Sequence, residues 1–348
     1  MTTELSAVAD PLGRLHDLPR ARLGHAPTPL EAMPNLGATT GGADLFVKRD
    51  DCTGLALGGN KVRQLEFYVG EAVAEGADTI LITGAVQSNF VRLAAAAARK
   101  LAMDCHIQLE ERVKKSDPLY RESGNVLLDR VLGATIHSYP DGEDEAGADR
   151  HLGEVAAGLK DAGRRPYIIP LAPGHKPLGA LGYVVAAEEI LAQAADGAPA
   201  FDEVVVASGS GNTHAGLLFG LRALGSAARV TGICVRRDAA AQRGRIKTRC
   251  DEIADLLGVA PTVDDDDVIV DDRFLAPGYG QLNPPTAAAI KAAAQSEGLI
   301  LDPVYTGKTM AGCLDRARQA GESSKLLFIH TGGTPALFAY GATVLEDI

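Results

Sequence analysis

One lysine of this chain is well placed for covalent chemistry. Lys61 follows Gly58, Gly59 and Asn60, and it precedes apolar residues that recur at helical spacing, namely Val62, Leu65, Val69 and Val73. Asn60 is expected to cap this helix, and the two glycines let the backbone approach a ligand closely. A lysine shielded from water at such a place can lose its proton and attack a carbonyl group to form an imine. On this stretch alone, the alternative is a solvated lysine in the first turn of a helix.

A glycine-rich turn far along the chain could bind a phosphate group. It follows the apolar run Val204–Val206 and precedes a helical pattern, so it is typical of a strand, a tight turn and a helix. Backbone N–H groups in such a turn, together with the positive end of a helix, make an anion site. The candidate phosphate-binding residues are Ser208, Gly209, Ser210, Gly211, Asn212 and Thr213. The alternative is a turn that binds nothing.

Two kinds of phosphorylated ligand suit this turn. A dinucleotide fingerprint needs a third glycine, and that position is His214, although Arg236 and Arg237 after the next strand would suit the 2′-phosphate of NADP in an oxidoreductase. A single phosphomonoester needs only the turn and the helix end. Combined with a reactive Lys61, this favours pyridoxal phosphate, with the aldehyde on Lys61 and the phosphate on residues 208–213.

Composition limits the classes of partner. The 348 residues are 46% hydrophobic and 23% charged, and their net charge of −11 disfavours nucleic acid and anionic membranes as partners. The five cysteines form no Cys-x-x-Cys pair, which fits a reducing compartment. Residues 1–5 do not begin a signal peptide, and no apolar run suggests a membrane span. We therefore expect a cytoplasmic protein without a metal site, in which the acidic run Asp264–Asp267 is a solvated loop.

The alternation of strand and helix patterns predicts an α/β fold. Apolar strands separated by helices are typical of mainly parallel sheets with helices on both faces, and the chain is long enough for two such sheets. The expected strands are 79–83, 106–109, 135–139, 167–171, 203–207, 229–235, 268–270 and 326–329. The expected helices include 91–102, 125–132, 145–161, 178–195, 214–224, 239–257, 284–297 and 308–320. Residues 1–44 contain five prolines and are expected to be irregular.

Six sequence blocks give the chain a family resemblance. They are Lys48–Asp51, Gly58–Lys61, Gln87–Asn89, Ser208–Gly216, Pro277–Gly280 and Leu301–Lys308. Nearly the whole chain resembles pyridoxal-phosphate enzymes of the tryptophan-synthase-β type (fold type II), in the branch of D-cysteine desulfhydrases and aminocyclopropane-carboxylate (ACC) deaminases, which includes L-cysteate sulfo-lyases. The resemblance implies a large cofactor-binding domain (1–60 and 172–348), a small α/β domain (61–171), the cofactor between them, and a homodimer.

The resemblance also implies a role for individual residues. Lys61 would form the imine with the cofactor and later move the substrate proton, and Asn89 would contact the 3′-oxygen of the ring. Ser88, with Gln87 and Phe90 beside it, would lie near the substrate carboxylate, and Thr306 would meet the ring nitrogen. Tyr279 and Tyr305 would flank the substrate. From the residues alone, Ser88 and Asn89 could equally cap a helix, and the tyrosines could be core residues.

The expected reaction is β-elimination from an amino acid. Once the amino acid is joined to the cofactor its α-proton becomes acidic, and a good leaving group on Cβ then departs to give pyruvate and ammonia. Thr306 is neutral and cannot keep the ring nitrogen protonated, whereas the cyclopropane-opening deaminases carry glutamate there. Two departures from the desulfhydrase pattern lie near the substrate: Phe90 replaces the usual histidine, and a loop that is usually glycine with small polar residues contains His175 and Lys176. A cation added beside the site slightly favours L-cysteate over D-cysteine as the substrate. The alternative is that Lys176 points into solvent. A non-catalytic binding protein on the same scaffold is a third hypothesis.

Overall fold

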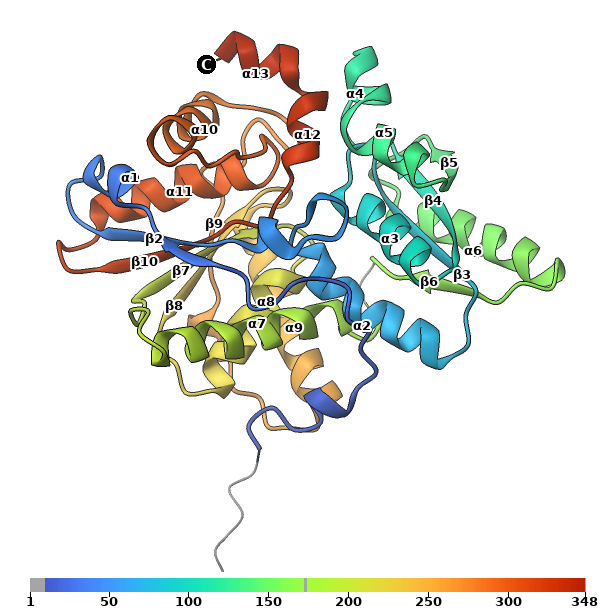
Figure 1. Cartoon of the computed structure of the whole chain (residues 1–348), viewed down its shortest axis with the longest axis horizontal. Helices are drawn as coiled ribbons and strands as arrows, with labels where there is room; N and C mark the ends of the chain where they lie inside the picture. The colour runs from blue at the N-terminus through green and yellow to red at the C-terminus, as the bar shows by residue number, and fades with distance from the viewer. Residues whose placement is uncertain (1–9, 172–173, 348) are drawn as a thin grey trace, which may run out of the picture.

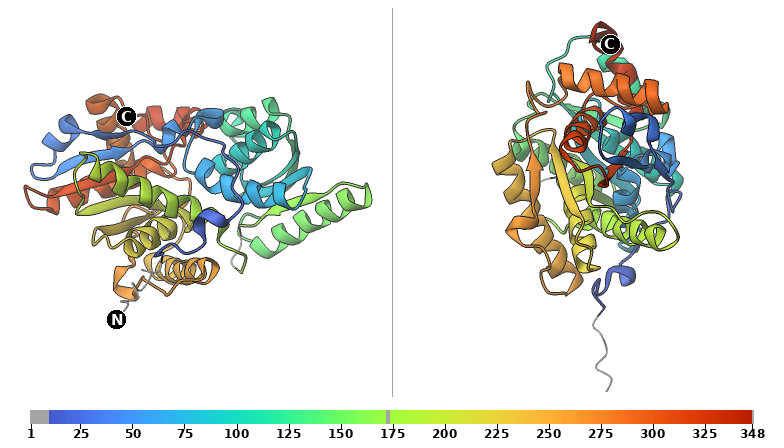
Figure 2. Two further views of the ribbon diagram at one scale, coloured as in Figure 1. Left: turned by 60° about the horizontal axis from the view of Figure 1, so that its bottom comes forward. Right: turned by 90° about the vertical axis from the view of Figure 1, so that its left-hand side faces the viewer.

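The fold has two lobes, each built around its own sheet (Figure 1 and Figure 2). The computed structural model describes residues 10–171 and 174–347. The six-stranded sheet has the order β1-β2-β10-β7-β8-β9, and the four-stranded sheet has the order β5-β4-β3-β6. The strand pairs are parallel except for β1 and β2. The prediction of an α/β fold with two mainly parallel sheets is therefore confirmed.

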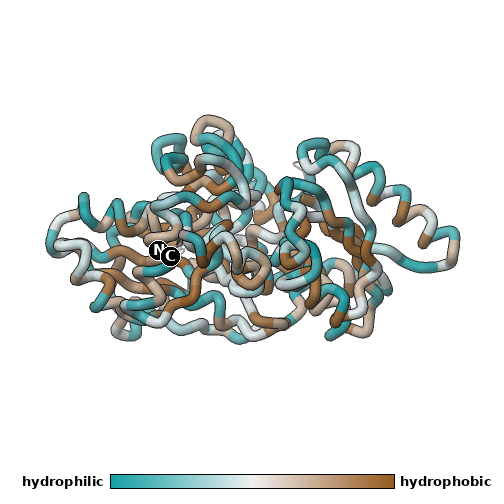
Figure 3. Tube along the Cα trace, turned by 90° about the horizontal axis from the view of Figure 1, so that it is seen from above, coloured by the Kyte–Doolittle hydropathy of each residue, from teal (hydrophilic) through white to brown (hydrophobic). Residues whose placement is uncertain are grey.

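The larger sheet is apolar because helices cover both of its faces. Its strands are β1 (Leu30–Ala32), β2 (Asp44–Lys48), β7 (Glu203–Ser208), β8 (Arg229–Cys234), β9 (Ile269–Asp271) and β10 (Lys325–Ile329). Its helices are α1 (Pro34–Ala38), α7 (Leu178–Ala195), α8 (Asn212–Ala223), α9 (Ala239–Leu257), α10 (Pro284–Glu297), α11 (Thr306–Gln319), α12 (Thr334–Ala339) and α13 (Gly341–Asp347). Hydrophobic segments (brown) gather inside each lobe, and polar segments lie outside (Figure 3).

The smaller sheet is centred on β3, which is buried along its whole length. Its strands are β3 (Thr79–Ala85), β4 (Asp104–Glu110), β5 (Thr135–Tyr139) and β6 (Pro166–Ile169), and its helices are α3 (Asn89–Lys100), α4 (Pro118–Glu122), α5 (Gly124–Val131) and α6 (Glu145–Asp161). Thr79 lies opposite Asp104 and Ala85 opposite Glu110, so β3 and β4 end together. Short 3₁₀ segments complete the chain at Leu15–Asp17, Asp50–Thr53, Leu55–Leu57 and Asp265–Asp267.

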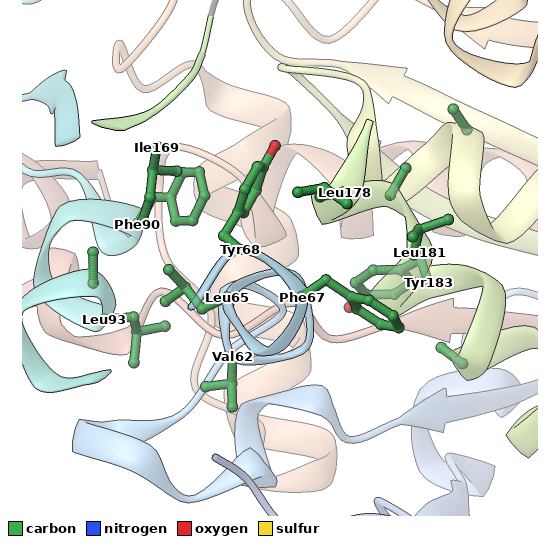
Figure 4. Close-up of a cluster of buried hydrophobic side chains, with 14 of the residues drawn as sticks. Val62, Leu65, Phe67, Tyr68, Phe90, Leu93, Ile169, Leu178, Leu181 and Tyr183 are labelled. Atoms are coloured by element: carbon green, nitrogen blue, oxygen red, sulfur yellow. The ribbon is translucent and has the colours of Figure 1, made fainter. Parts of the chain in front are cut away.

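Helix α2 (Lys61–Ala74) lies between the lobes. Figure 4 looks along this helix and shows Leu65 directed toward Phe90 and Leu93 of α3, while Phe67 is directed toward Leu181 and Tyr183 of α7. Residues Val62 to Gly70 are all buried, so the helix is packed on every side rather than along one apolar stripe. Lys61, its first residue, is consequently fixed at the junction of the two lobes.

A buried ionic cluster supports this junction; we name it the Asp50 cluster, after its central carboxylate. Arg63 of α2 donates to both Asp50 oxygens at 2.9 and 3.0 Å and to both Glu189 oxygens at 2.9 Å. Lys48, at the end of β2, donates to Glu189 at 2.5 Å, and the Tyr183 hydroxyl donates to Asp50. Burial alone would raise the pKa of Glu189, but the Arg63 and Lys48 charges lower this pKa to about 2. Part of the Lys48–Asp51 block is therefore structural.

The unexpected elements are β1 and α1 in the N-terminal region and the short helix α4, and several other elements begin or end one or two residues from the expected positions. Helices α6, α7, α9 and α10 and strand β5 have the expected bounds. The irregular region expected for residues 1–44 instead contains β1 and α1, because β1 pairs with the distant residues Phe46–Lys48. Asn60 makes no capping hydrogen bond, so that expectation is wrong; its side chain donates instead to Thr213 Oγ1 at 2.8 Å. The domain limits at residues 60 and 171 remain a prediction.

Helix α7 combines length with an apolar composition. Among the helices of residues 10–171 and 174–347, it is the one that is long and apolar enough, on those two criteria, to cross a membrane. The expectation that no segment reaches this length is therefore wrong for α7. The helix packs against α2 and α8, and its Glu189 belongs to the Asp50 cluster, as is typical of a core helix.

Candidate active site

A cleft opens where strands of both sheets end at their carboxyl edges. It is lined by Lys61 at the start of α2, by residues 83–85 and 88–90 from the end of β3 to the start of α3, by Gly209–Gly211 after β7, and by Tyr279 and Tyr305. Ligands in open α/β folds bind outside the carboxyl ends of the strands, at crevices of this kind. The cleft brings Lys61 and the glycine-rich turn together, although Lys61 and Gly209 are 148 positions apart in the chain.

The environment of Lys61 favours the neutral amine. Its Nζ lies 4.7 Å from the centre of the Phe90 ring and 3.2 Å from Gln64 Oε1. Burial lowers the pKa of Lys61 to about 8, since an ammonium group loses its hydration there. Phe90, which replaces the histidine of the desulfhydrase pattern, therefore forms part of the apolar surface beside this amine.

Two other lysines have a lowered pKa, and their positions exclude them as the reactive amine. Lys48 Nζ is bound by Glu189, Gln193 and the Thr28 carbonyl group. Burial lowers the pKa of Lys308 to about 8, and its Nζ donates to the carbonyl groups of Leu275 and Gly278. Neither lines the cleft, so geometry rather than acidity singles out Lys61.

The turn after β7 presents donors to the cleft. Gly211 has φ +102°, a left-handed conformation that favours glycine, and it precedes α8, whose first N–H groups have no partner within the helix. The Thr213 hydroxyl oxygen accepts hydrogen bonds from Asn60 Nδ2 and Gln64 Nε2, both at 2.8 Å. With both lone pairs engaged, its proton is free to be donated to an anion in the cleft. The arrangement is that of a small phosphate cradle beside an amine.

Two residues predicted for this cradle do not line the cleft. The Ser208 hydroxyl is buried between His214 Nδ1 at 3.0 Å and Gln242 Nε2 at 2.8 Å. Asn212 is directed toward the Tyr68 hydroxyl at 3.5 Å. Gly209, Ser210, Gly211 and Thr213 do line it. The side chains of Ser208 and Asn212 are therefore turned away from the cleft, and only their backbone groups would be available to a phosphate.

The start of α3 forms another part of the cleft wall. Ser88 is the N-cap of α3 and accepts from the Val91 N–H group, so the capping alternative holds for it, yet it also lines the cleft. Asn89 and Phe90 line the cleft beside it. Gln87 does not, because its side chain holds the carbonyl groups of Tyr120 and Ser123 and the N–H group of Asn125. The first-turn N–H groups of α3 can receive a carboxylate.

Tyr279 and Tyr305 form a hydroxyl pair in the cleft. Their oxygens are 2.6 Å apart, and their rings meet edge to face with centres 6.0 Å apart. Burial and the neighbouring Tyr279 raise the pKa of Tyr305, so its hydroxyl stays protonated. The pair can therefore offer a hydroxyl donor to a group bound in the cleft.

Three predicted contacts lie away from the cleft. Thr306 is buried, and its hydroxyl donates to Asp302 Oδ2 and accepts from the Asp302 N–H group, both at 2.7 Å. Lys176 is 65% exposed and pairs with Glu71 at 2.8 Å, and His175 is also exposed. The expected cation beside the substrate is therefore not supplied by Lys176, because Glu71 of α2 holds it at the surface.

Charged residues that the sequence did not single out line the cleft instead. Arg112 pairs with Glu110 at 2.7 Å just beyond β4. Arg236 and Arg237 were considered for a 2′-phosphate, but both bind Glu145 Oε1 of the smaller lobe, at 2.8 and 3.0 Å. These charged residues follow different strands that meet only in the folded protein, so no local sequence pattern marks them as one group. The Arg236-Arg237 pair after a strand was the one hint in the sequence that charged residues line this cleft.

The fold and the cleft suit an α/β enzyme in which a small phosphorylated aldehyde would bind between Lys61 and the start of α8. Comparison with known proteins gives this class a family. The chain belongs to the family described as pyridoxal-phosphate dependent enzymes, whose model matches residues 21–332. This membership decides between the two phosphorylated ligands in favour of pyridoxal phosphate, and the dinucleotide alternative is wrong.

Relatives that match nearly the whole chain carry two different names. The chain is 44% identical over 331 residues to a D-cysteine desulfhydrase of Klebsiella pneumoniae subsp. pneumoniae, covering 94% of this chain and 98% of the relative. It is 42% identical over 333 residues to a 1-aminocyclopropane-1-carboxylate deaminase of Burkholderia multivorans, with the same coverage. The crystal structure of an ACC deaminase homologue matches with a TM-score of 0.86 at 38% identity, over 97% of this chain and 99% of the other. O-ureido-L-serine synthase shares the fold alone, with a TM-score of 0.65 at 19% identity over 94% of this chain and 95% of the other.

The residues of the cleft suit the cofactor. An amine with a lowered pKa, a helix start with free N–H groups and the Thr213 hydroxyl match an aldehyde and a phosphate at opposite ends of one small ring. Lys61 would hold the aldehyde carbon, Gly209–Thr213 the phosphate, and Asn89 the ring oxygen.

We expect the cofactor-free protein to capture pyridoxal phosphate faster as pH rises. Below a pKa of about 8, Lys61 is an ammonium group and cannot attack; above it, the amine is free. Stopped-flow absorbance of the new imine should give a rate that rises with a midpoint near pH 8. A midpoint above pH 10 would mean that Lys61 is solvated and that the cleft does not activate it.

Proposed function

We propose that this enzyme is a carbon–sulfur lyase that eliminates the β-substituent of a sulfur amino acid, giving pyruvate, ammonia and a sulfur leaving group. The observation that carries the proposal is that one cleft contains both the Lys61 amine and the paired Tyr279 and Tyr305 hydroxyls, which are proton donors for the leaving group. Thr306 stands where the cyclopropane-opening deaminases carry glutamate, and its hydroxyl is bound to Asp302, so this position brings no carboxylate into the cleft. This favours elimination over ring opening. We expect the enzyme to be cytoplasmic, in keeping with its scattered cysteines, and to form a homodimer, as the family resemblance implies.

The residues divide the work of the reaction. Bound pyridoxal phosphate supplies the electron sink that makes the Cα–H bond acidic. Ser88 and the first turn of α3 bind the substrate carboxylate, and Lys61 Nζ accepts the Cα proton as a general base whose pKa is close to working pH. Tyr305, held protonated beside Tyr279, donates toward the departing sulfur group. Phe90 keeps water away from the amine.

The preferred substrate is L-cysteate, which releases sulfite, and the alternative is D-cysteine, which releases sulfide. Support for cysteate now comes from Arg236 and Arg237, because two guanidinium groups share the single carboxylate of Glu145 at the cleft. A guanidinium group can donate two parallel hydrogen bonds to two of the three oxygens of a sulfonate. Support for D-cysteine comes from the relatives named D-cysteine desulfhydrase.

A substrate panel tests the proposal. Both enantiomers of cysteate and of cysteine, together with ACC, would be assayed for sulfite, sulfide, pyruvate and 2-oxobutanoate. Sulfite with equimolar pyruvate from L-cysteate is the expected result. If D-cysteine is turned over efficiently and cysteate is not, the substrate preference is reversed. Turnover of ACC alone would refute elimination. A coloured protein that releases no keto acid from any of these substrates would be a binding protein.

Arg236→Met should discriminate between the two substrates. Losing charge-assisted hydrogen bonds to the sulfonate should raise KM for cysteate about 10–100-fold, while turnover of D-cysteine stays within about threefold. Arg121→Met is the matched control, since its exposed pair with Glu111 lies away from the cleft, and it should change neither. Equal losses for both substrates would show that Arg236 maintains structure and does not read the sulfonate.

A further inference from the structure

Arg92 of α3 is a charged side chain that the reaction does not account for. Its side chain is fully buried and is one of the largest buried side chains of the described residues. Its Nη1 donates to Asn125 Oδ1 at 3.0 Å and to Asn89 Oδ1 at 3.3 Å, and its Nη2 donates to the Gly58 carbonyl group at 2.8 Å. A guanidinium group costs free energy to bury, so its partners indicate what it is needed for.

The first of these partners, Asn89, is held in a single orientation. Its Oδ1 accepts from Arg92 and also from Asn125 Nδ2 at 3.0 Å. Asn125 cannot flip to relieve this, because its Oδ1 accepts from Arg92 and its Nδ2 also donates to the Gln87 carbonyl group at 3.0 Å. With its oxygen turned inward, Asn89 presents its NH₂ group to the cleft that it lines.

The second partner lies on the segment that carries the reactive amine. Gly58 begins the block Gly58–Lys61, and its φ of +64° is in the left-handed region. A Cβ atom there would lie 2.1 Å from the Asp51 carbonyl oxygen, so the backbone path is fixed by packing. One guanidinium group therefore links the helix that carries Asn89 to the loop that leads into Lys61.

The charge of Arg92 is only partly balanced. Burial lowers its pKa to about 10, which leaves it a cation at neutral pH. The opposing carboxylate is Asp129 of α5; burial raises the pKa of Asp129 to about 7, against the effect of Arg92. Within residues 10–171 and 174–347, three buried atoms here have no hydrogen-bond partner: the two carboxylate oxygens of Asp129 and Nε of Arg92. A net positive charge thus lies behind the Asn89 amide and strengthens its N–H groups as donors to an anionic oxygen.

We propose that Arg92 is a positioning residue for the cofactor, which fixes the Asn89 amide as a donor and polarises it toward the 3′-oxygen of pyridoxal phosphate. The inference rests on the contact between Asn89 and that oxygen. Gln87 and Asn125, which were expected to be substrate neighbours or simple helix residues, complete the support from behind.

Binding of two ligands by the cofactor-free protein tests this role without turnover. The ligands are pyridoxal phosphate and its analogue that lacks the 3-hydroxyl group. Arg92→Gln and Asn125→Ala should each weaken pyridoxal phosphate about 10–100-fold and the analogue less than about threefold, because only the former has the oxygen. Arg92→Lys keeps the positive charge but lacks the planar set of guanidinium donors. Its affinity for pyridoxal phosphate should therefore lie between those of Arg92→Gln and the wild type. Arg99→Gln, on the same helix but exposed, should behave as wild type.

Two results would overturn the proposal. One is an equal loss of affinity for both ligands in the Arg92 and Asn125 variants, which is what a purely structural role predicts. The other is a wild-type protein that binds both ligands equally well. If the ligand-dependent loss occurs but no substrate yields pyruvate, the role of Arg92 stands and the proposed reaction fails. Should Arg92→Gln not fold, Arg92→Lys and Asn125→Ala carry the same comparison.

Discussion

Replacing Lys61 by alanine should remove elimination almost completely. The substitution removes the amine that forms the imine and that accepts the Cα proton, so kcat should fall by about 10³–10⁴-fold or more, and the imine absorbance should disappear. Pyridoxal phosphate should still bind through the turn after β7, because the Thr213 hydroxyl and the α8 N–H groups are unchanged. The measurements are pyruvate release, the visible spectrum and equilibrium dialysis of the cofactor.

The other buried lysines make this prediction specific. Lys308 shares a pKa of about 8 with Lys61 but holds two backbone carbonyl groups away from the cleft. Lys247→Ala, which removes a surface pair with Asp251, serves as the control and should leave rate and colour unchanged. An Lys61→Ala protein with its colour and most of its activity intact would show that another amine carries the cofactor.

Of the substitutions proposed here, replacing Asp50 by alanine should lower the free energy of unfolding the most. Asp50 accepts from Arg63, Thr28 and Tyr183, and its removal leaves Arg63 buried with one carboxylate fewer. Breaking a buried pair from one side costs about 3–5 kcal/mol, because a charge is left uncompensated. The free energy of unfolding, measured by urea denaturation, should fall by that amount. Activity should fall as well, because α2 carries both Arg63 and Lys61.

An exposed ion pair provides the comparison. Asp104 pairs with Arg99 and Arg164, and its side chain is 45% exposed, so Asp104→Ala should cost no more than about 1 kcal/mol. If Asp50→Ala and Asp104→Ala destabilise the protein equally, the Asp50 cluster contributes no more than a surface pair. The difference between the two variants therefore measures what burial adds.

Long periodic segments made most of the fold predictable. Helices α7, α9 and α10 have the expected bounds because apolar spacing agrees with local end signals, such as Pro284 at the start of α10 and Gly298 at its end. Strand β1 was missed because its three residues form a strand only by pairing with β2. Such pairing depends on contacts that short-range patterns do not contain.

The site was predictable where a motif combined backbone and side-chain requirements. Lys61, Asn89, Gly209 and Tyr305 meet in the cleft as expected. The roles of Thr306 and Lys176 were less predictable, since a hydroxyl can turn to its own Asp302 and a long side chain to a neighbouring Glu71. The charged wall contributed by Arg112, Glu145 and Asp149 needs both lobes folded, and no single stretch of sequence contains it.

Locating the cofactor chemically is the most direct test of whether one small molecule bridges Lys61 and the glycine-rich turn. Borohydride reduction of the holoenzyme would trap the imine, and peptide mass mapping would identify the modified lysine. We expect the adduct on the peptide that contains Lys61, at one cofactor per chain. An adduct on Lys48, on Lys308 or on a surface lysine, with Lys61 unmodified, would contradict the account.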